Sequence, residues 1–124
     1  MFYSPITLSV TIPAGLAVSS SVTVHGLQLL ELLSPPGWTA ASLSFQGSID
    51  GASWFNIHAA NGDEIVINCA ANRLYRLNSL DGAGALGGLL PFGLRLFRVR
   101  SGTAAAPVNQ GANRTFVITA RQTT

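Results

Sequence analysis

The chain has 124 residues, of which 48% are hydrophobic and only 10% are charged, whereas a typical soluble domain carries about 25% charged residues. This composition excludes a disordered chain, which would be poor in apolar residues, and the length fits one domain over residues 1–124. Cys69 is the only cysteine, which excludes an internal disulfide and a multi-cysteine metal site, so we expect no metal and no cofactor.

Charge is divided unevenly along the chain. Residues 1–64 hold four acidic residues and no basic one, while residues 65–124 hold all seven arginines and one acidic residue. A molecule with this polarity can stack on copies of itself or sit on an acidic surface. The net charge is only +2, and no dense basic cluster of the kind that binds nucleic acid is present. We therefore expect no nucleic-acid partner.

Membrane insertion and secretion are not predicted. A membrane-spanning helix needs about 20 consecutive apolar residues, and the longest candidate, Leu27 to Leu33, is interrupted by Gln28 and Glu31. The first basic residue is Arg73, so the basic start of a secretion signal is missing. We expect a protein that does not bind membranes and that stays in the cytoplasm where it is made.

The first third of the chain alternates between apolar and polar residues with the period of two that is typical of strands. Residues 6–12 alternate in this way and end at a Pro-Ala-Gly turn, and the pattern resumes over residues 18–24. The apolar positions of Leu27 to Leu33 suit a helical face nearly as well as a strand. We favour a strand there because the neighbouring segments are strands.

Turn signals divide the rest of the chain into further short strands. A strand ending at Gly47 and a returning strand over Trp54 to Ile57 flank Asp50-Gly51, a dipeptide typical of hairpins. More strands are predicted around residues 65–67, 74–77, 94–100 and 114–121, with a glycine-rich loop over 78–91. About eight short strands at this spacing predict an all-β fold, a single antiparallel β-sandwich or jelly roll.

Few residues suit catalysis. Cys69 with His25 or His58 is a candidate nucleophile–base pair, but a cysteine within an apolar run is typical of a small buried strand residue. Asp50 and Asp63 lie in turn sequences, where local hydrogen bonding explains an aspartate. We therefore expect a protein that is not an enzyme.

Two arginines and two tryptophans are candidates for binding. Arg98 and Arg100 share one face of a strand by alternation. They form either a solvated face or a basic stripe that meets an acidic neighbour, such as Asp63-Glu64 of another subunit. Trp38 and Trp54 either pack in the core or serve as platforms on which a sugar stacks.

Apolar side chains in segments that would otherwise be exposed to solvent are candidates for contact with a partner. These predicted interface residues are Phe2, Tyr3, Leu86, Leu89, Leu90 and Phe92.

Two segments carry a family resemblance. Residues 45–54 read FQGSIDGASW, and residues 94–102 read LRLFRVRSG. In this respect the chain resembles small β-sandwich virion proteins of tailed bacteriophages, in which a GS-x-DG-x-x-W hairpin precedes an FRVRSG-like strand. It resembles the discoidin-type jelly roll more distantly.

The phage resemblance implies a non-enzymatic structural subunit of the virion, assembled in the host cytoplasm. We predict a capsid decoration (cement) protein whose partners are the major capsid protein or other virion subunits, with contacts between copies of the chain. The alternatives are a glycan- or receptor-binding module of a head fibre or tail tip, and another structural component of the tail.

Overall fold

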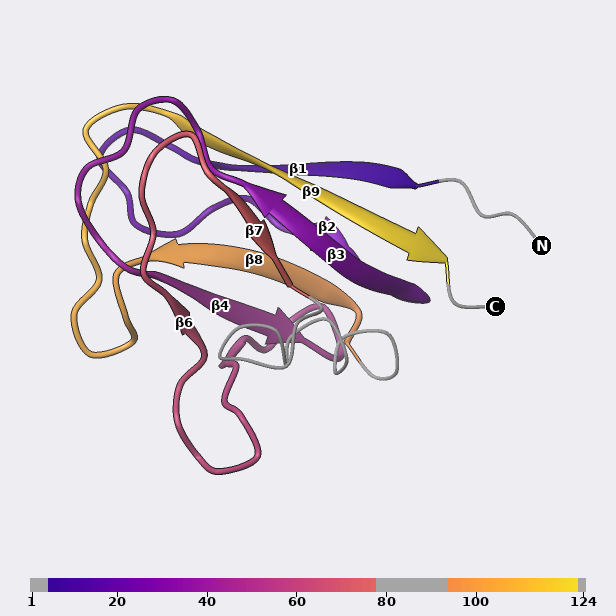
Figure 1. Cartoon of the computed structure of the whole chain (residues 1–124). Coiled ribbons are helices and arrows are strands. Elements are labelled where there is room, and N and C mark those ends of the chain that lie inside the picture. Colours follow the sequence, from indigo (N-terminus) through magenta and orange to yellow (C-terminus); the bar gives the residue numbers. More distant parts are fainter. Residues whose placement is uncertain (1–4, 78–93, 123–124) are drawn as a thin grey trace.

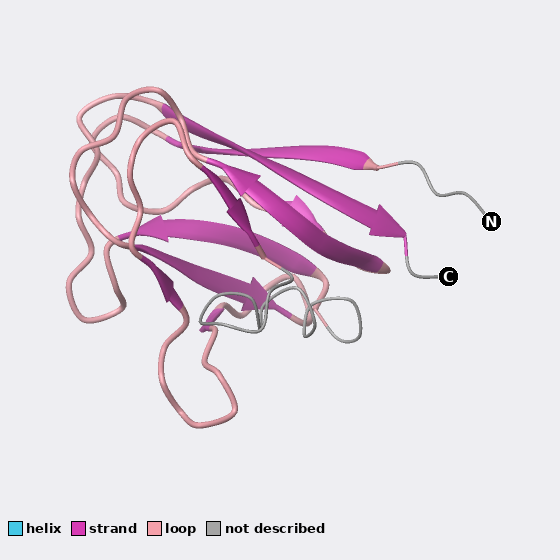
Figure 2. Ribbon diagram, viewed as in Figure 1, coloured by secondary structure: helices cyan, strands magenta, loops and turns pink. Residues whose placement is uncertain are grey.

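The computed structural model describes residues 5–77 and 94–122, which form strands joined by turns (Figures 1 and 2). Two antiparallel sheets pack on each other, which confirms the all-β sandwich predicted from the sequence. The strands are β1 (Ile6–Ile12), β2 (Val22–Thr23), β3 (Leu27–Leu33), β4 (Leu43–Ser48), β5 (Phe55–Asn56), β6 (Val66–Ile67), β7 (Leu74–Arg76), β8 (Leu96–Ser101) and β9 (Arg114–Gln122).

The first sheet, sheet A, has the strand order β1-β9-β3-β7. The β1–β9 ladder runs unbroken from Ile6 opposite Ala120 to Ile12 opposite Arg114. Because side chains alternate between the faces of a strand, Val10 and Ile12 enter the core, while the alternate residues Thr7, Ser9 and Thr11 lie on the outer face.

A β-bulge in β3 explains the ambiguous spacing of residues 27–33, which form a strand as predicted. The register of β3 on β9 shifts between Leu29 and Glu31. The extra residue lets Leu29 and Leu32 both enter the core, although strict alternation would place them on opposite faces. The same shift places Glu31 and Leu33 on the outer face.

The second sheet, sheet B, has the strand order β2-β8-β4-β5, and β6 also pairs with β4. β2 is shorter than the strand predicted over residues 18–24. The physical reason is that this segment crosses between the sheets: the Ser19 N–H donates to Val99 of β8, while the Ser20 N–H donates to Thr11 of β1. Backbone bonds to two different sheets prevent one continuous ladder.

The core lies between the two sheets. The rings of Phe45 and Phe97 stack with their centroids 5.6 Å apart, and both side chains are fully buried. Sheet A contributes Phe116 and Ile118 from the facing side. The alternation predicted for residues 94–100 is confirmed within β8, where Phe97 and Val99 point inward; β8 begins at Leu96, and Arg95 is exposed.

The hairpin predicted at Asp50-Gly51 exists, but its connection is longer than a two-residue turn. Gly47 pairs with Phe55, so the returning strand begins after Trp54 instead of at it. The Asp50 carboxylate accepts hydrogen bonds from the backbone N–H groups of Ala52 and Ser53 at 2.8 and 2.9 Å. This aspartate-centred turn is what places Trp54 outside the ladder.

Candidate functional site

The outer face of sheet B carries polar side chains from neighbouring strands. Register places Gln46 opposite both Arg98 and Asn56, and Ser44 opposite Arg100. The adjoining connections contribute further side chains that contact this group. We call the whole set the arginine face; its members are Ser44, Gln46, Trp54, Asn56, Glu64, Arg98 and Arg100.

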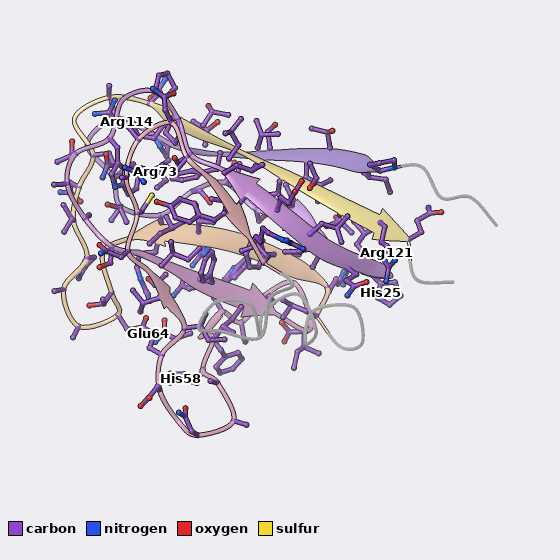
Figure 3. All side chains as sticks on the ribbon, viewed as in Figure 1. His25, His58, Glu64, Arg73, Arg114 and Arg121 are labelled. Atoms are coloured by element: carbon purple, nitrogen blue, oxygen red, sulfur yellow. The ribbon has the colours of Figure 1, made fainter. Side chains whose placement is uncertain are left out.

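Arg100 forms a buried ion pair on this face. Its Nη2 donates to Oε2 of Glu64 at 2.6 Å, its Nη1 donates to Asn56 at 2.9 Å, and its Nε donates to Ser44 at 3.0 Å. Glu64 also accepts a hydrogen bond from the backbone N–H of Ala104. Figure 3 shows Glu64 shortly before β6, in the connection between β5 and β6 that also carries His58. The acidic partner of Arg100 is therefore Glu64 of its own chain.

Arg98 is held differently. Its Nε donates to Oε1 of Gln46 at 2.9 Å, and its guanidinium carbon lies 4.0 Å from the centre of the Trp54 ring. A cation at this distance is attracted to the negative face of an indole ring. Within residues 5–77 and 94–122, the terminal nitrogens of Arg98 have no hydrogen-bond partner.

The arginine face carries more positive than negative charge. Loss of solvation and, next, the like charge of Arg100 lower the pKa of the Arg98 guanidinium. An arginine nevertheless stays protonated in proteins. Glu64 balances one of the two guanidinium groups, and the second is held in place by an amide and a ring, which carry no charge.

The two tryptophans occupy different environments. Trp38 packs edge-on against Phe116 at 5.3 Å between ring centroids, and its indole N–H donates to the carbonyl of Ala41. Trp38 is therefore partly buried and packs against the core. Trp54 lies on the arginine face, where Arg98 covers one side of its ring.

The predicted interface residues near the N-terminus and in the glycine-rich loop lie outside the residues that the structure describes. They are Phe2, Tyr3, Leu86, Leu89, Leu90 and Phe92.

Exposed apolar residues that sequence reasoning did not single out lie on two other surfaces. On the outer face of sheet A, Leu33 lies directly opposite both Leu74 and Val117; we call these three residues the leucine row. Leu33 and Leu74 are 42% and 58% exposed. Ile49, just after β4, and Phe55, the first residue of β5, are also exposed, and we call them the hairpin patch. Alternation alone marks Leu33 as buried, and only the bulge in β3 turns it outward.

The candidate nucleophile–base pair does not form among the described residues. Cys69 is part of the core, and its sulfur lies 3.8 Å from the carbonyl oxygen of Ala70. Burial raises the pKa of the Cys69 thiol to about 11, so the reactive thiolate is scarce at neutral pH. Neither His25 nor His58 forms a hydrogen bond with the Cys69 thiol in the described part of the chain, and Nδ1 of His58 lies 3.0 Å from the carbonyl oxygen of Gly62. Within the described ranges, His, Cys, Asp and Glu form no group of three that would hold a metal.

Comparisons of the chain with known protein families, with curated proteins and with solved structures found no match. Within the part of the chain that the structure describes, no helix is long and apolar enough to cross a membrane.

Proposed function

We propose that this chain is a non-enzymatic structural subunit of a phage particle, a capsid decoration protein that binds the major capsid protein or other virion subunits. The observation that carries this proposal is the leucine row, in which two exposed leucines and the half-buried Val117 are aligned across three adjacent strands. Contiguous apolar groups on a protein surface are typical of contact sites. The resemblance of residues 45–54 and 94–102 to virion proteins supplies the kind of partner.

The energetics favour a subunit that uses more than one surface. Burying a whole leucine side chain stabilises a complex by about 1.5–3 kcal/mol, and about half of Leu33 and of Leu74 is still exposed. Together they contribute about 2 kcal/mol, which is less than the 4–15 kcal/mol or so that association costs in lost freedom. A stable attachment therefore needs further contacts.

The hairpin patch supplies a second contact surface. Ile49 follows β4 and Phe55 begins β5 in sheet B, whereas the leucine row lies on the outer face of sheet A. Two separate apolar surfaces suit a subunit that bridges two neighbours in a lattice. Binding to the assembled particle then stabilises the particle by mass action. The apolar residues predicted near the N-terminus and in the glycine-rich loop extend this contact set.

A rebinding experiment tests the proposal. Particles stripped of the chain are incubated with purified wild type or with the double variant L33S/L74S, and occupancy is measured by sedimentation. Losing about 2 kcal/mol of apolar contact should weaken attachment about thirtyfold. L16S is the matched control, because Leu16 is a 54% exposed leucine outside the leucine row and the hairpin patch. Equal occupancy for all three proteins would contradict the proposal.

A second candidate function is a glycan-binding module of a head fibre or tail tip. The specific observation in its favour is Trp54, an aromatic ring on a polar outer sheet face next to amide and guanidinium groups. Aromatic and planar polar side chains together are what a small polar ligand requires. Trp38 is not part of this candidate, because its ring packs on Phe116.

A further inference from the structure

The arginine face holds one cation in a fixed position without a carboxylate partner. Arg98 has five N–H groups, of which the Nε–H donates to Gln46 at 2.9 Å. The centre of the Trp54 ring lies 4.0 Å from the guanidinium carbon, so the ring also restrains the group. This leaves the four N–H groups on the terminal nitrogens without a partner in the described part of the chain. A guanidinium group restrained in this way loses little freedom when it binds a ligand.

The carboxylates of Glu64 and Asp50 already have hydrogen-bond partners. Glu64 accepts hydrogen bonds from Arg100 and from the backbone N–H of Ala104. Asp50, in the β4–β5 connection, accepts N–H groups from its own turn. Neither carboxylate pairs with Arg98, and its terminal N–H groups, which are not buried, can pair with an anion from outside the described residues.

The geometry points to a carboxylate on a saccharide: we propose that the arginine face binds an acidic sugar, with Arg98 pairing with the sugar carboxylate. Arginine binds a planar carboxylate through two parallel N–H groups. Asn56 is exposed, and its side-chain oxygen accepts from Gln46 and Arg100, so its N–H₂ group is available for a sugar hydroxyl. This inference rests on the second candidate function and names its ligand class and its recognition residue.

The composition of the face favours a sugar over a protein partner. The core of a protein interface is apolar and, although arginine and tryptophan are enriched there, serine is depleted, whereas the strand residues of the arginine face besides its two arginines are serine, glutamine and asparagine. Phe55, next to Trp54 in the chain, pairs with Gly47, a position of the opposite sheet face. The exposed apolar groups that a protein partner would cover lie in the leucine row and the hairpin patch.

Calorimetric titration with two forms of one polymer tests the inference. The probes are polygalacturonate and the same polymer with its carboxylates methyl-esterified. We expect the acidic form to bind wild type and the ester to bind about tenfold more weakly or not at all. R98A and R98K should each lose about tenfold in affinity, because lysine cannot form the paired hydrogen bonds. R76A is the matched control: it removes the same charge from an exposed position on the outer face of sheet A and should bind like wild type.

Three results would overturn the inference. If both polymers bind equally and only W54A weakens them, the chain is a glycan-binding module but Arg98 does not select an acid. If R98A and R76A weaken binding equally, the attraction is general electrostatics. If neither polymer binds and R98A instead weakens rebinding to stripped particles, the partner of Arg98 is a protein carboxylate. Unchanged urea midpoints for the variants show in each case that the fold is intact.

Discussion

Replacing Glu64 by glutamine should destabilise the fold strongly, although glutamine has nearly the same size and shape as glutamate. The change removes the charge that faces Arg100, whose side chain is only 7% exposed. Breaking a buried ion pair from one side costs about 3–5 kcal/mol, because the remaining charge stays buried without a counter-charge. Ser44 and Asn56 still accept from Arg100, so we expect the lower end of that range, about 3 kcal/mol.

The same geometry predicts an asymmetry between the two partners. Glu64 is 18% exposed and keeps the Ala104 N–H as a donor when Arg100 is removed. R100M should therefore cost less than E64Q. In the double variant E64M/R100M no buried charge remains, and such replacements are close to neutral. The double variant should thus be more stable than E64Q alone.

Urea unfolding followed by tryptophan fluorescence measures all three variants, since Trp38 packs against Phe116 in the folded state. A loss of 3 kcal/mol should lower the urea midpoint by about 1–3 M, given the usual slope for a small domain. A midpoint for E64Q within the error of wild type, or a larger loss for R100M than for E64Q, would refute the assignment of a buried pair that depends on Glu64.

Three further predictions concern pH and backbone geometry. Burial raises the pKa of the Cys69 thiol from 9.0 to about 11, so the thiol of the unfolded chain ionises first and the free energy of unfolding falls as pH rises through that window. C69A should remove about 2–3 kcal/mol of this alkaline loss, which is measured by urea unfolding at about pH 8 and about pH 11. Backbone N–H groups of Ser53 and Ala52 lower the pKa of Asp50, so the stabilisation from the Asp50 carboxylate is present above the pKa of the unfolded chain and is lost as pH falls through the pKa of the folded state. D50N should therefore make the free energy of unfolding less dependent on pH in acid, and an unchanged dependence would show that Asp50 is not its source. G102A should cost about 2 kcal/mol or more, because Gly102 has a φ of 89° and an added methyl would contact Ala106 and Val108; a urea midpoint equal to that of wild type would show that the turn relaxes freely.

Sequence alternation predicted the ladders that bury one face and expose the other. β1 follows it over its whole length, β9 follows it from Phe116 to Ala120, and β8 places Phe97 inward and Arg98 outward as expected. Alternation failed where register depends on a partner strand. The exposure of Leu33 follows from the bulge between Leu29 and Glu31, and that bulge is defined only by the pairing of β3 with β9.

The arginine face was predicted in part. Alternation placed Arg98 and Arg100 on one face, but it does not indicate how far each side chain is buried or which residues distant in the sequence it contacts. Glu64 lies 36 residues from Arg100 and reaches it through the fold. Trp54 meets Arg98 because the Asp50 turn ends the hairpin later than a two-residue turn would. Both contacts follow from the lengths of connections, which local propensity does not specify.

The most direct test of the decoration role is the thermal stability of particles with and without the chain. Stripped particles are heated alone, after rebinding wild type, and after incubation with L33S/L74S, and genome release is followed with a DNA-binding dye. We predict that wild type raises the release temperature and that the double variant, at the same concentration, raises it less. Release at the same temperature in all three samples would contradict the account.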